Sequence, residues 1–123
     1  MVESQNMSDL ELMDRSILDG FKKFGQGEFI SSMIDLFFKT TGGALGEIAS
    51  LVALEDWKGV AFSVHSLRSG ASNLGLVRLT KMAESIEAAA KKADSTTVRE
   101  QSLLIPAIYL ESCEALKAYQ TNG

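Results

Sequence analysis

The chain has 123 residues, 46% of them hydrophobic, and a formal net charge of −4 at pH 7. This length suits one domain with a single core, and the acidic balance argues against a nucleic-acid-binding protein, which needs a basic face. The sequence has no run of about 18 apolar residues and no basic, apolar leader, so we expect no membrane span, no signal peptide and a cytoplasmic location.

Cys113 is the only cysteine and His65 the only histidine. One cysteine excludes an internal disulfide, and the two residues are too few for a metal site built from soft ligands. We therefore expect no metal bound by this chain, and we interpret Cys113 as a small apolar residue on a buried helix face.

The first predicted helix follows a short polar segment. Residues 1–7 show no periodicity, and we expect a flexible leader there, followed by a single helical domain over residues 8–121. Ser8 followed by Glu11 is a capping-box pattern, which predicts a short amphipathic helix to about Phe24. The side chains expected on its inner face are Leu10, Met13, Ile17 and Phe21.

The second predicted helix contains two adjacent glycines, Gly42 and Gly43. Each glycine costs about 1 kcal/mol in a helix interior, so a break into two helices is one interpretation. The apolar residues Phe37, Ala44 and Leu51 nevertheless recur every seven positions, which favours one long helix over about 28–54, bent at the glycines. Its inner face is predicted to carry Phe29, Met33, Leu36 and Phe37.

The third long helix is predicted to begin at Trp57, after an acidic cap at Glu55-Asp56, and to end at Gly75. One stripe of this helix is apolar, because hydrophobic residues recur at spacings of three and four. The stripe consists of Val60, Val64, Leu67, Ala71 and Leu74.

Two more helices complete the prediction. The first has Leu79, Met82, Ile86 and Ala89 on its inner face and closes at Lys91-Lys92, whose charges suit the negative end of the helix dipole. The last is capped by Asp94 or Ser95, and Pro106 should either kink it or force a restart. Its broad apolar face is predicted to carry Val98, Leu104, Ile105, Ile108, Ala115, Leu116 and Tyr119. The expected fold class is all-α, an antiparallel up-down-up-down four-helix bundle with an additional short N-terminal helix.

His65 is predicted to face solvent, because at 100° per residue it lies more than a quarter-turn from the apolar stripe of its helix. The residues sharing its face are Lys58, Ala61, Phe62, Arg68, Ser69 and Ser72. A histidine with an ordinary pKa of about 6.5 is mostly neutral at cytoplasmic pH, and a neutral imidazole nitrogen is a nucleophile. An exposed imidazole among small residues, one turn from a cation, suits phosphate chemistry.

The segment from Val64 to Gly75 resembles the signature of the histidine-containing phosphotransfer (HPt) domain, His-x-Leu-Lys/Arg-Gly-x-Ser/Ala-x-x-Leu-Gly. The positions in step with it are His65, Leu67, Arg68, Ala71, Leu74 and Gly75. One position departs, because Ser69 stands where the family has glycine and Gly70 follows one place late. The helix pattern from about Met13 to Tyr119 also resembles the family's bundle.

The resemblance implies that His65 is a phosphoacceptor, which takes a phosphoryl group from one receiver-domain aspartate and passes it to another. Its partners would be receiver domains of a hybrid sensor kinase or of response regulators. The Mg²⁺ ion would belong to the receiver, so the chain would need no cofactor. Because the sequence has no Walker-type loop, we expect no intrinsic ATP-dependent kinase activity. Nothing in the pattern suggests a large exposed seam beyond the bundle, so we also expect a monomer.

The neighbours of His65 admit more than one role. Arg68 would approach the phosphoryl oxygens or an acidic pocket of the partner, or be an ordinary surface cation. Ser69 and Ser72 would offer hydroxyl groups or only space. Phe62 would contact a docked partner, or pack under the N-terminal helix. Glu84 and Glu87 could orient the imidazole from the next helix, although we favour solvated carboxylates.

Two other functions fit the same sequence. A receiver-binding module would keep the docking face without accepting phosphate, and Ser69 is the feature that favours it, since a side chain near the imidazole would hinder in-line approach. A purely structural helical bundle would show neither binding nor phosphorylation. We favour the phosphotransfer function.

Overall fold

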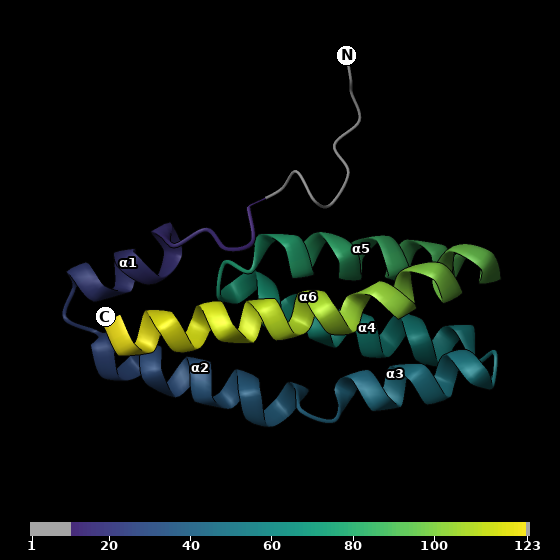
Figure 1. Ribbon diagram of the computed structural model, residues 1–123, viewed down its shortest axis with the longest axis horizontal. Helices are drawn as coiled ribbons and strands as arrows, with labels where there is room; N and C mark the ends of the chain where they lie inside the picture. Colours follow the sequence, from purple (N-terminus) through teal and green to yellow (C-terminus); the bar gives the residue numbers. More distant parts are fainter. Residues whose placement is uncertain (1–10, 123) are drawn as a thin grey trace, which may run out of the picture.

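The computed structural model describes residues 11–122, which form six α-helices and no strand. The helices are α1 (Ser16–Lys23), α2 (Gly27–Thr41), α3 (Ala44–Ala53), α4 (Trp57–Asn73), α5 (Val77–Lys91) and α6 (Ser95–Asn122). Along the long axis, α2 and α3 run one way, α4 returns, α5 runs out again and α6 returns (Figure 1). The all-α antiparallel bundle with a short additional N-terminal helix is therefore confirmed.

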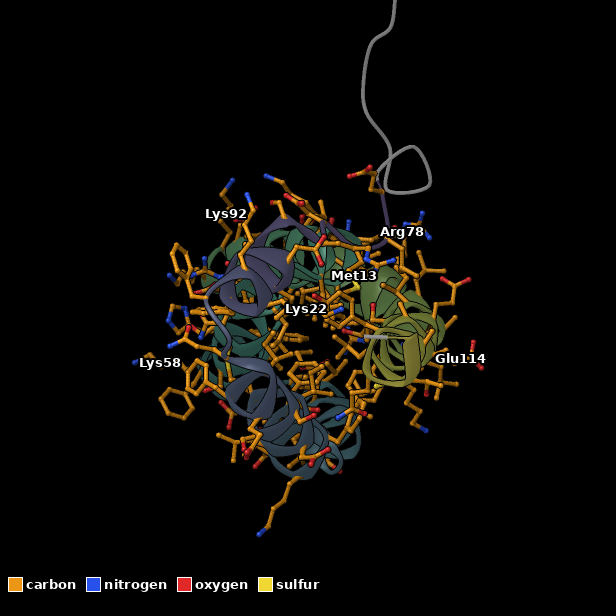
Figure 2. The ribbon with its side chains drawn as sticks, turned by 90° about the vertical axis from the view of Figure 1, so that its left-hand side faces the viewer. Met13, Lys22, Lys58, Arg78, Lys92 and Glu114 are labelled. Atoms are coloured by element: carbon orange, nitrogen blue, oxygen red, sulfur yellow. The ribbon has the colours of Figure 1, made fainter. Side chains whose placement is uncertain are left out.

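The core lies between the helices, and side chains from all sides converge on it in the end-on view (Figure 2). The five stripe residues predicted on α4 are all at most 2% exposed. On α5, Leu79, Met82, Ile86 and Ala89 are buried as predicted, and Cys113 of α6 is 8% exposed. No helix among the described residues is long and apolar enough to cross a membrane.

The N-terminal helix begins later than predicted. Ser8, Leu10 and the predicted leader lie outside the described residues, but residues 11–15 are not helical and α1 starts only at Ser16. The Asp14 side chain accepts a hydrogen bond from the Ser16 N–H at 3.0 Å, and the Asp14 N–H donates to the Gly75 carbonyl at 2.7 Å. These two bonds hold the segment just before α1, and the capping box expected at Ser8 lies outside the described residues. Leu18 is the buried residue of α1, whereas Ile17 is 41% exposed.

The single long helix predicted over 28–54 is wrong, because the chain breaks between α2 and α3 at the two glycines. The Gly42 N–H still bonds to the Phe38 carbonyl, and the Thr41 hydroxyl group bonds to the Phe37 carbonyl and to the Tyr109 hydroxyl of α6. Thr41 is thus fixed to α6 where the chain turns. Phe37 is buried, while Ala44 and Leu51 are half-buried, so the apolar face continues through the break.

Two inward assignments on α2 are also wrong. Phe29 is 50% and Leu36 59% exposed, whereas Ile30 and Ile34 are buried and Met33 is half-buried. The buried face of α2 is therefore centred on positions 30, 34, 37 and 41 rather than on positions 29, 33 and 36.

The ends of α4 and the start of α6 follow the predicted capping chemistry. The Asp56 carboxylate accepts the Gly59 N–H at 2.9 Å, and Gly75 adopts φ +75° just beyond α4. Asp94, and not Ser95, caps α6, because its carboxylate accepts the Thr97 N–H at 3.2 Å.

Helix α6 continues through Pro106 without a restart, and Figure 1 shows it changing direction along its length. Leu104 is 57% exposed, contrary to prediction, and Ala115 and Ile108 are half-buried. The remaining predicted residues of the α6 face, Val98, Ile105, Leu116 and Tyr119, are buried.

Tyr119 links α6 to α1, and its ionisation should lower the free energy of unfolding at alkaline pH. Burial, together with the hydrogen bond it donates to Asp19 at 2.7 Å and the charge of that carboxylate, raises the pKa of Tyr119 to about 12. An unfolded tyrosine has a pKa of about 10, so the folded state holds this proton more tightly. The stabilisation is complete below pH 10, and we expect up to about 2 kcal/mol to be lost as the pH rises toward 12. Urea unfolding between pH 9 and 11.5 measures the slope, which should be shallower in Tyr119→Phe. Equal slopes would contradict this assignment.

Candidate functional site

The imidazole of His65 faces solvent, as the helical periodicity predicts. Its side chain is 52% exposed, whereas Val64 and Leu67, its neighbours on the inner face of α4, are buried. Glycine allows α2 to approach α4 here, since a Cβ on Gly70 would lie 3.3 Å from the Phe37 ring. The packed inner face of α4 therefore holds the histidine outward at a fixed position.

Glu87 of α5 contacts the imidazole directly. Its Oε2 atom lies 2.9 Å from His65 Nδ1 and 3.2 Å from Lys91 Nζ, and its side chain is only 9% exposed. The favoured prediction of a solvated carboxylate is therefore wrong for Glu87, and the orienting alternative describes what is seen. Glu84 is different, because its side chain is 45% exposed and pairs with Arg68 and Lys81 rather than with the histidine.

Arg68 lies along the same carboxylate. Its Nε donates to Glu87 Oε1 at 3.0 Å, its Nη2 lies 3.0 Å from His65 Nδ1, and its Nη1 is 4.0 Å from Glu84 Oε2. The guanidinium is thus held by side chains of this chain, one turn from His65. It is not a free surface cation.

The charge state of Glu87 follows from these contacts. Burial raises its pKa, but hydrogen bonds from Lys91 and His65, together with the charges of Lys91 and Arg68, outweigh burial and lower the pKa below its ordinary value. Glu87 is therefore an anion at neutral pH, and an anion accepts hydrogen bonds but does not donate them.

The two ring nitrogens of His65 have different surroundings. Nδ1 lies 2.9 Å from Glu87 Oε2 and 3.0 Å from Arg68 Nη2, while no side chain among residues 11–122 bonds to Nε2. A guanidinium only donates, so Arg68 could bond to Nδ1 only if that nitrogen carried the lone pair; a proton on Nδ1 instead donates to the Glu87 carboxylate and leaves the lone pair on Nε2. The ionised carboxylate therefore favours the tautomer whose nucleophilic nitrogen is Nε2, the nitrogen that bonds to no described side chain.

The other predicted site residues surround the histidine without bonding to it. Lys58, Phe62, Ser69 and Ser72 are exposed, and Ala61 is half-buried against the core. Phe62 is 75% exposed, which excludes the alternative that it packs under the N-terminal helix. These residues form an open surface beside the imidazole.

The sequence prediction undervalued Glu87 and assigned Lys91 only to the helix dipole. A signal was present, because Glu87 lies on the alanine-rich inner face of α5, four residues after Ala83 and three before Ala90, which are both buried. A carboxylate on such a face needs a partner, and Arg68 and His65 on α4 provide it. Among the described residues, no group of three His, Cys, Asp or Glu side chains could hold a metal ion.

Comparisons with known proteins identify the family of the chain. The family model of the Hpt domain matches residues 32–119, most of the chain. The bundle also resembles the crystal structure of histidine-containing phosphotransfer protein B (HptB) from Pseudomonas aeruginosa PAO1, with a TM-score of 0.81 and 16% identity over 91% of this chain and 96% of that one. A search of curated proteins found no match. The chain is therefore a member of the Hpt domain family, the histidine-containing phosphotransfer domains.

Proposed function

We propose that His65 carries a phosphoryl group between receiver-domain aspartates in a multistep phosphorelay. One observation supports this assignment above the others: the exposed imidazole has Nδ1 against an ionised, buried Glu87, while Nε2 is open to an incoming partner. Membership in the Hpt domain family supports phosphotransfer through a histidine, and His65 is the only histidine in the sequence.

The transfer step needs no reactant other than the imidazole of His65 and the aspartyl phosphate of the partner. The Nε2 lone pair attacks the phosphorus of the partner's aspartyl phosphate, the N–P bond forms, and the O–P bond breaks to release the aspartate carboxylate. The proton stays on Nδ1, and Glu87 offsets the positive charge that develops on the ring. The return step to a second receiver is the reverse. The Mg²⁺ ion that such a reaction needs would be supplied by the receiver, which stabilises the phosphoryl oxygens.

The neighbouring residues support partner contact. Arg68 places a fixed positive charge one turn from His65, where it can attract the phosphoryl oxygens. Ser69 and Ser72 have small side chains, which leave room for a partner to approach the ring. The contact surface extends along α4 to Lys58, Ala61 and Phe62. The expected partners are receiver domains of a hybrid sensor kinase or of response regulators.

The decisive experiment mixes the full chain with phosphorylated receiver domains of its source organism and Mg²⁺. We expect phosphate to move to the chain as an acid-labile, alkali-stable phosphohistidine, located at His65 by mass spectrometry. The exposed side chain of Ser69 favours one alternative function, that of a receiver-binding module that accepts no phosphate. That function predicts a complex without label, and a purely structural bundle predicts neither.

Glu87→Gln tests the orienting carboxylate. Glutamine keeps the shape but removes the charge that offsets the phosphorylated ring, and loss of such a contact costs about 1–2 kcal/mol. We expect transfer to slow by about tenfold. The ¹⁵N chemical shifts of His65 should show a proton on Nδ1 in the native chain and a mixture of tautomers in the variant.

The matched control is Glu114→Gln, an exposed carboxylate on α6. This substitution also removes one negative charge, but on the side of the bundle opposite Lys58, which lies on the helix of His65 (Figure 2). Its transfer rate and its His65 shifts should equal those of the native chain. A native rate and native shifts in Glu87→Gln would show that the carboxylate plays no part.

A further inference from the structure

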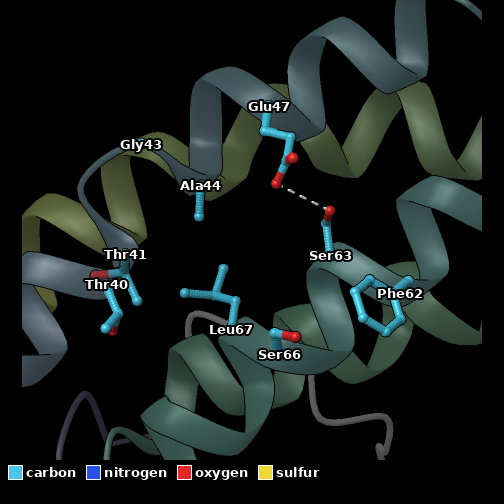
Figure 3. A pocket seen from close by; sticks show the side chains of 9 residues that line it. All are labelled: Thr40, Thr41, Gly43, Ala44, Glu47, Phe62, Ser63, Ser66 and Leu67. Carbon is cyan, nitrogen blue, oxygen red and sulfur yellow. Dashed lines mark hydrogen bonds between the residues drawn. The ribbon is translucent and has the colours of Figure 1, made fainter.

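The break between α2 and α3 opens a pocket on the flank of α4 away from α5. The pocket has a volume of about 530 Å³ and lies between the break, the first turns of α3 and the middle of α4 (Figure 3). Its lining includes Thr40, Glu47, Phe62, Ser63 and Ser66. Ser66 directly follows His65, so the pocket adjoins the proposed phosphoacceptor.

Glu47 is the only charged residue that lines this pocket. Its carboxylate is exposed and accepts one hydrogen bond, from the Ser63 hydroxyl at 3.3 Å, as Figure 3 shows. Among residues 11–122 no lysine or arginine lies within 4.0 Å of it, whereas Glu84 and Glu87 on the other flank of His65 are paired with cations. The negative charge of the pocket is therefore uncompensated.

The other lining groups suit a cationic side chain. Phe62 is 75% exposed at the pocket edge, and an aromatic face attracts ammonium and guanidinium groups. The hydroxyl groups of Thr40 and Ser66 add further acceptors to the lining of the same pocket. A carboxylate, an exposed aromatic ring and hydroxyl acceptors together match the donors of arginine or lysine better than they match an anion or an apolar group.

We infer that this pocket receives an arginine or lysine side chain of the receiver domain that docks at His65. The inference rests on the proposed function, because it names a contact of the partner in that reaction. The carboxylates on the α5 flank, Glu84 and Glu87, are paired with cations of this chain, so Glu47 is the carboxylate that offers charge complementarity to a cation of the partner. The contact would set affinity and orientation, and it would not touch the transferring phosphoryl group.

The test measures binding and transfer separately, with a receiver domain that exchanges phosphate with the chain. We expect Glu47→Gln to raise the Kd of the complex and the KM for phosphorylated receiver by about five- to tenfold, with kcat unchanged. Charge reversal in Glu47→Lys should weaken binding further. Glu114→Gln removes an equal charge outside the pocket and should leave both constants at native values. Circular dichroism checks that each variant is folded.

A charge swap identifies the occupant. Replacing the contacting arginine or lysine of the receiver with glutamate should restore binding to Glu47→Lys while weakening binding to the native chain. A native Kd in Glu47→Gln, or no receiver cation that rescues Glu47→Lys, would overturn the inference. Failure of the proposed function would give a different result. The receiver would still bind in a way that depends on Glu47, but His65 would accept no phosphate.

Discussion

Replacing His65 with glutamine should abolish phosphorylation of the chain by a phosphorylated receiver, a loss of at least about 10³-fold. Glutamine has no nucleophilic lone pair on nitrogen, yet its amide is long enough to bond to Glu87. The side chain of His65 is 52% exposed, so the bundle should keep its helicity and its unfolding midpoint. Radiolabel transfer and circular dichroism on the same preparation measure both expectations.

Binding separates this result from a loss of docking. His65→Gln should bind the receiver with a Kd close to that of the native chain, because the surface around Phe62 and the pocket at Glu47 is unchanged. A variant that still gains acid-labile phosphate would refute the assignment of His65. Acid-stable phosphate in either protein would instead indicate a hydroxyl acceptor, such as one of the exposed serines on α4.

Replacing Gly75 with alanine should have the largest effect on stability. Gly75 has φ +75°, and a Cβ there would lie 2.2 Å from the Asp14 carbonyl oxygen. The clash acts on the same corner where the Asp14 N–H bonds to the Gly75 carbonyl, so relieving it would separate the segment before α1 from the α4–α5 turn. We expect a loss of about 2–4 kcal/mol in the free energy of unfolding.

Gly46→Ala is the matched control for that measurement. Gly46 lies inside α3, and apart from its chain neighbours and the backbone of its own helix no atom lies within 4 Å of an added Cβ. Alanine is the better helix former, so this variant should be as stable as the native chain or more stable, by up to about 1 kcal/mol. Urea unfolding of both variants checks the pair. Equal midpoints for Gly75→Ala and the native chain would show that the corner tolerates a side chain.

The long helices could be predicted from the sequence because each carries its own evidence. The spacing of Val60, Val64, Leu67 and Ala71, the acidic cap at Asp56 and the left-handed Gly75 are local signals, and the structure confirms all of them. The exposure of His65 followed from the same spacing. Such signals need no knowledge of neighbouring helices.

The features that were missed depend on contacts between segments distant in sequence. The start of α1 is set by bonds of Asp14, one of them to Gly75, and the break after Thr41 coincides with its bond to Tyr109 of α6. The seven-residue spacing across Gly42 and Gly43 could not reveal that break, because the apolar face continues on both sides. The role of Glu87 likewise depends on the position of α5 against α4, and the pocket at Glu47 exists only because the helix is broken.

The break between α2 and α3 also bears on how such a protein could change its signalling specificity. Glu87 and Arg68, which hold the imidazole, lie on one flank of α4, whereas Glu47 and the broken helix lie on the other. Residues without shared contacts contribute additively, so if His65 and Glu47 act as proposed, substitutions around Glu47 would alter partner choice while the nucleophile kept its reactivity. A duplicated copy of this gene could thus acquire a separate, insulated pathway by altering a few surface positions.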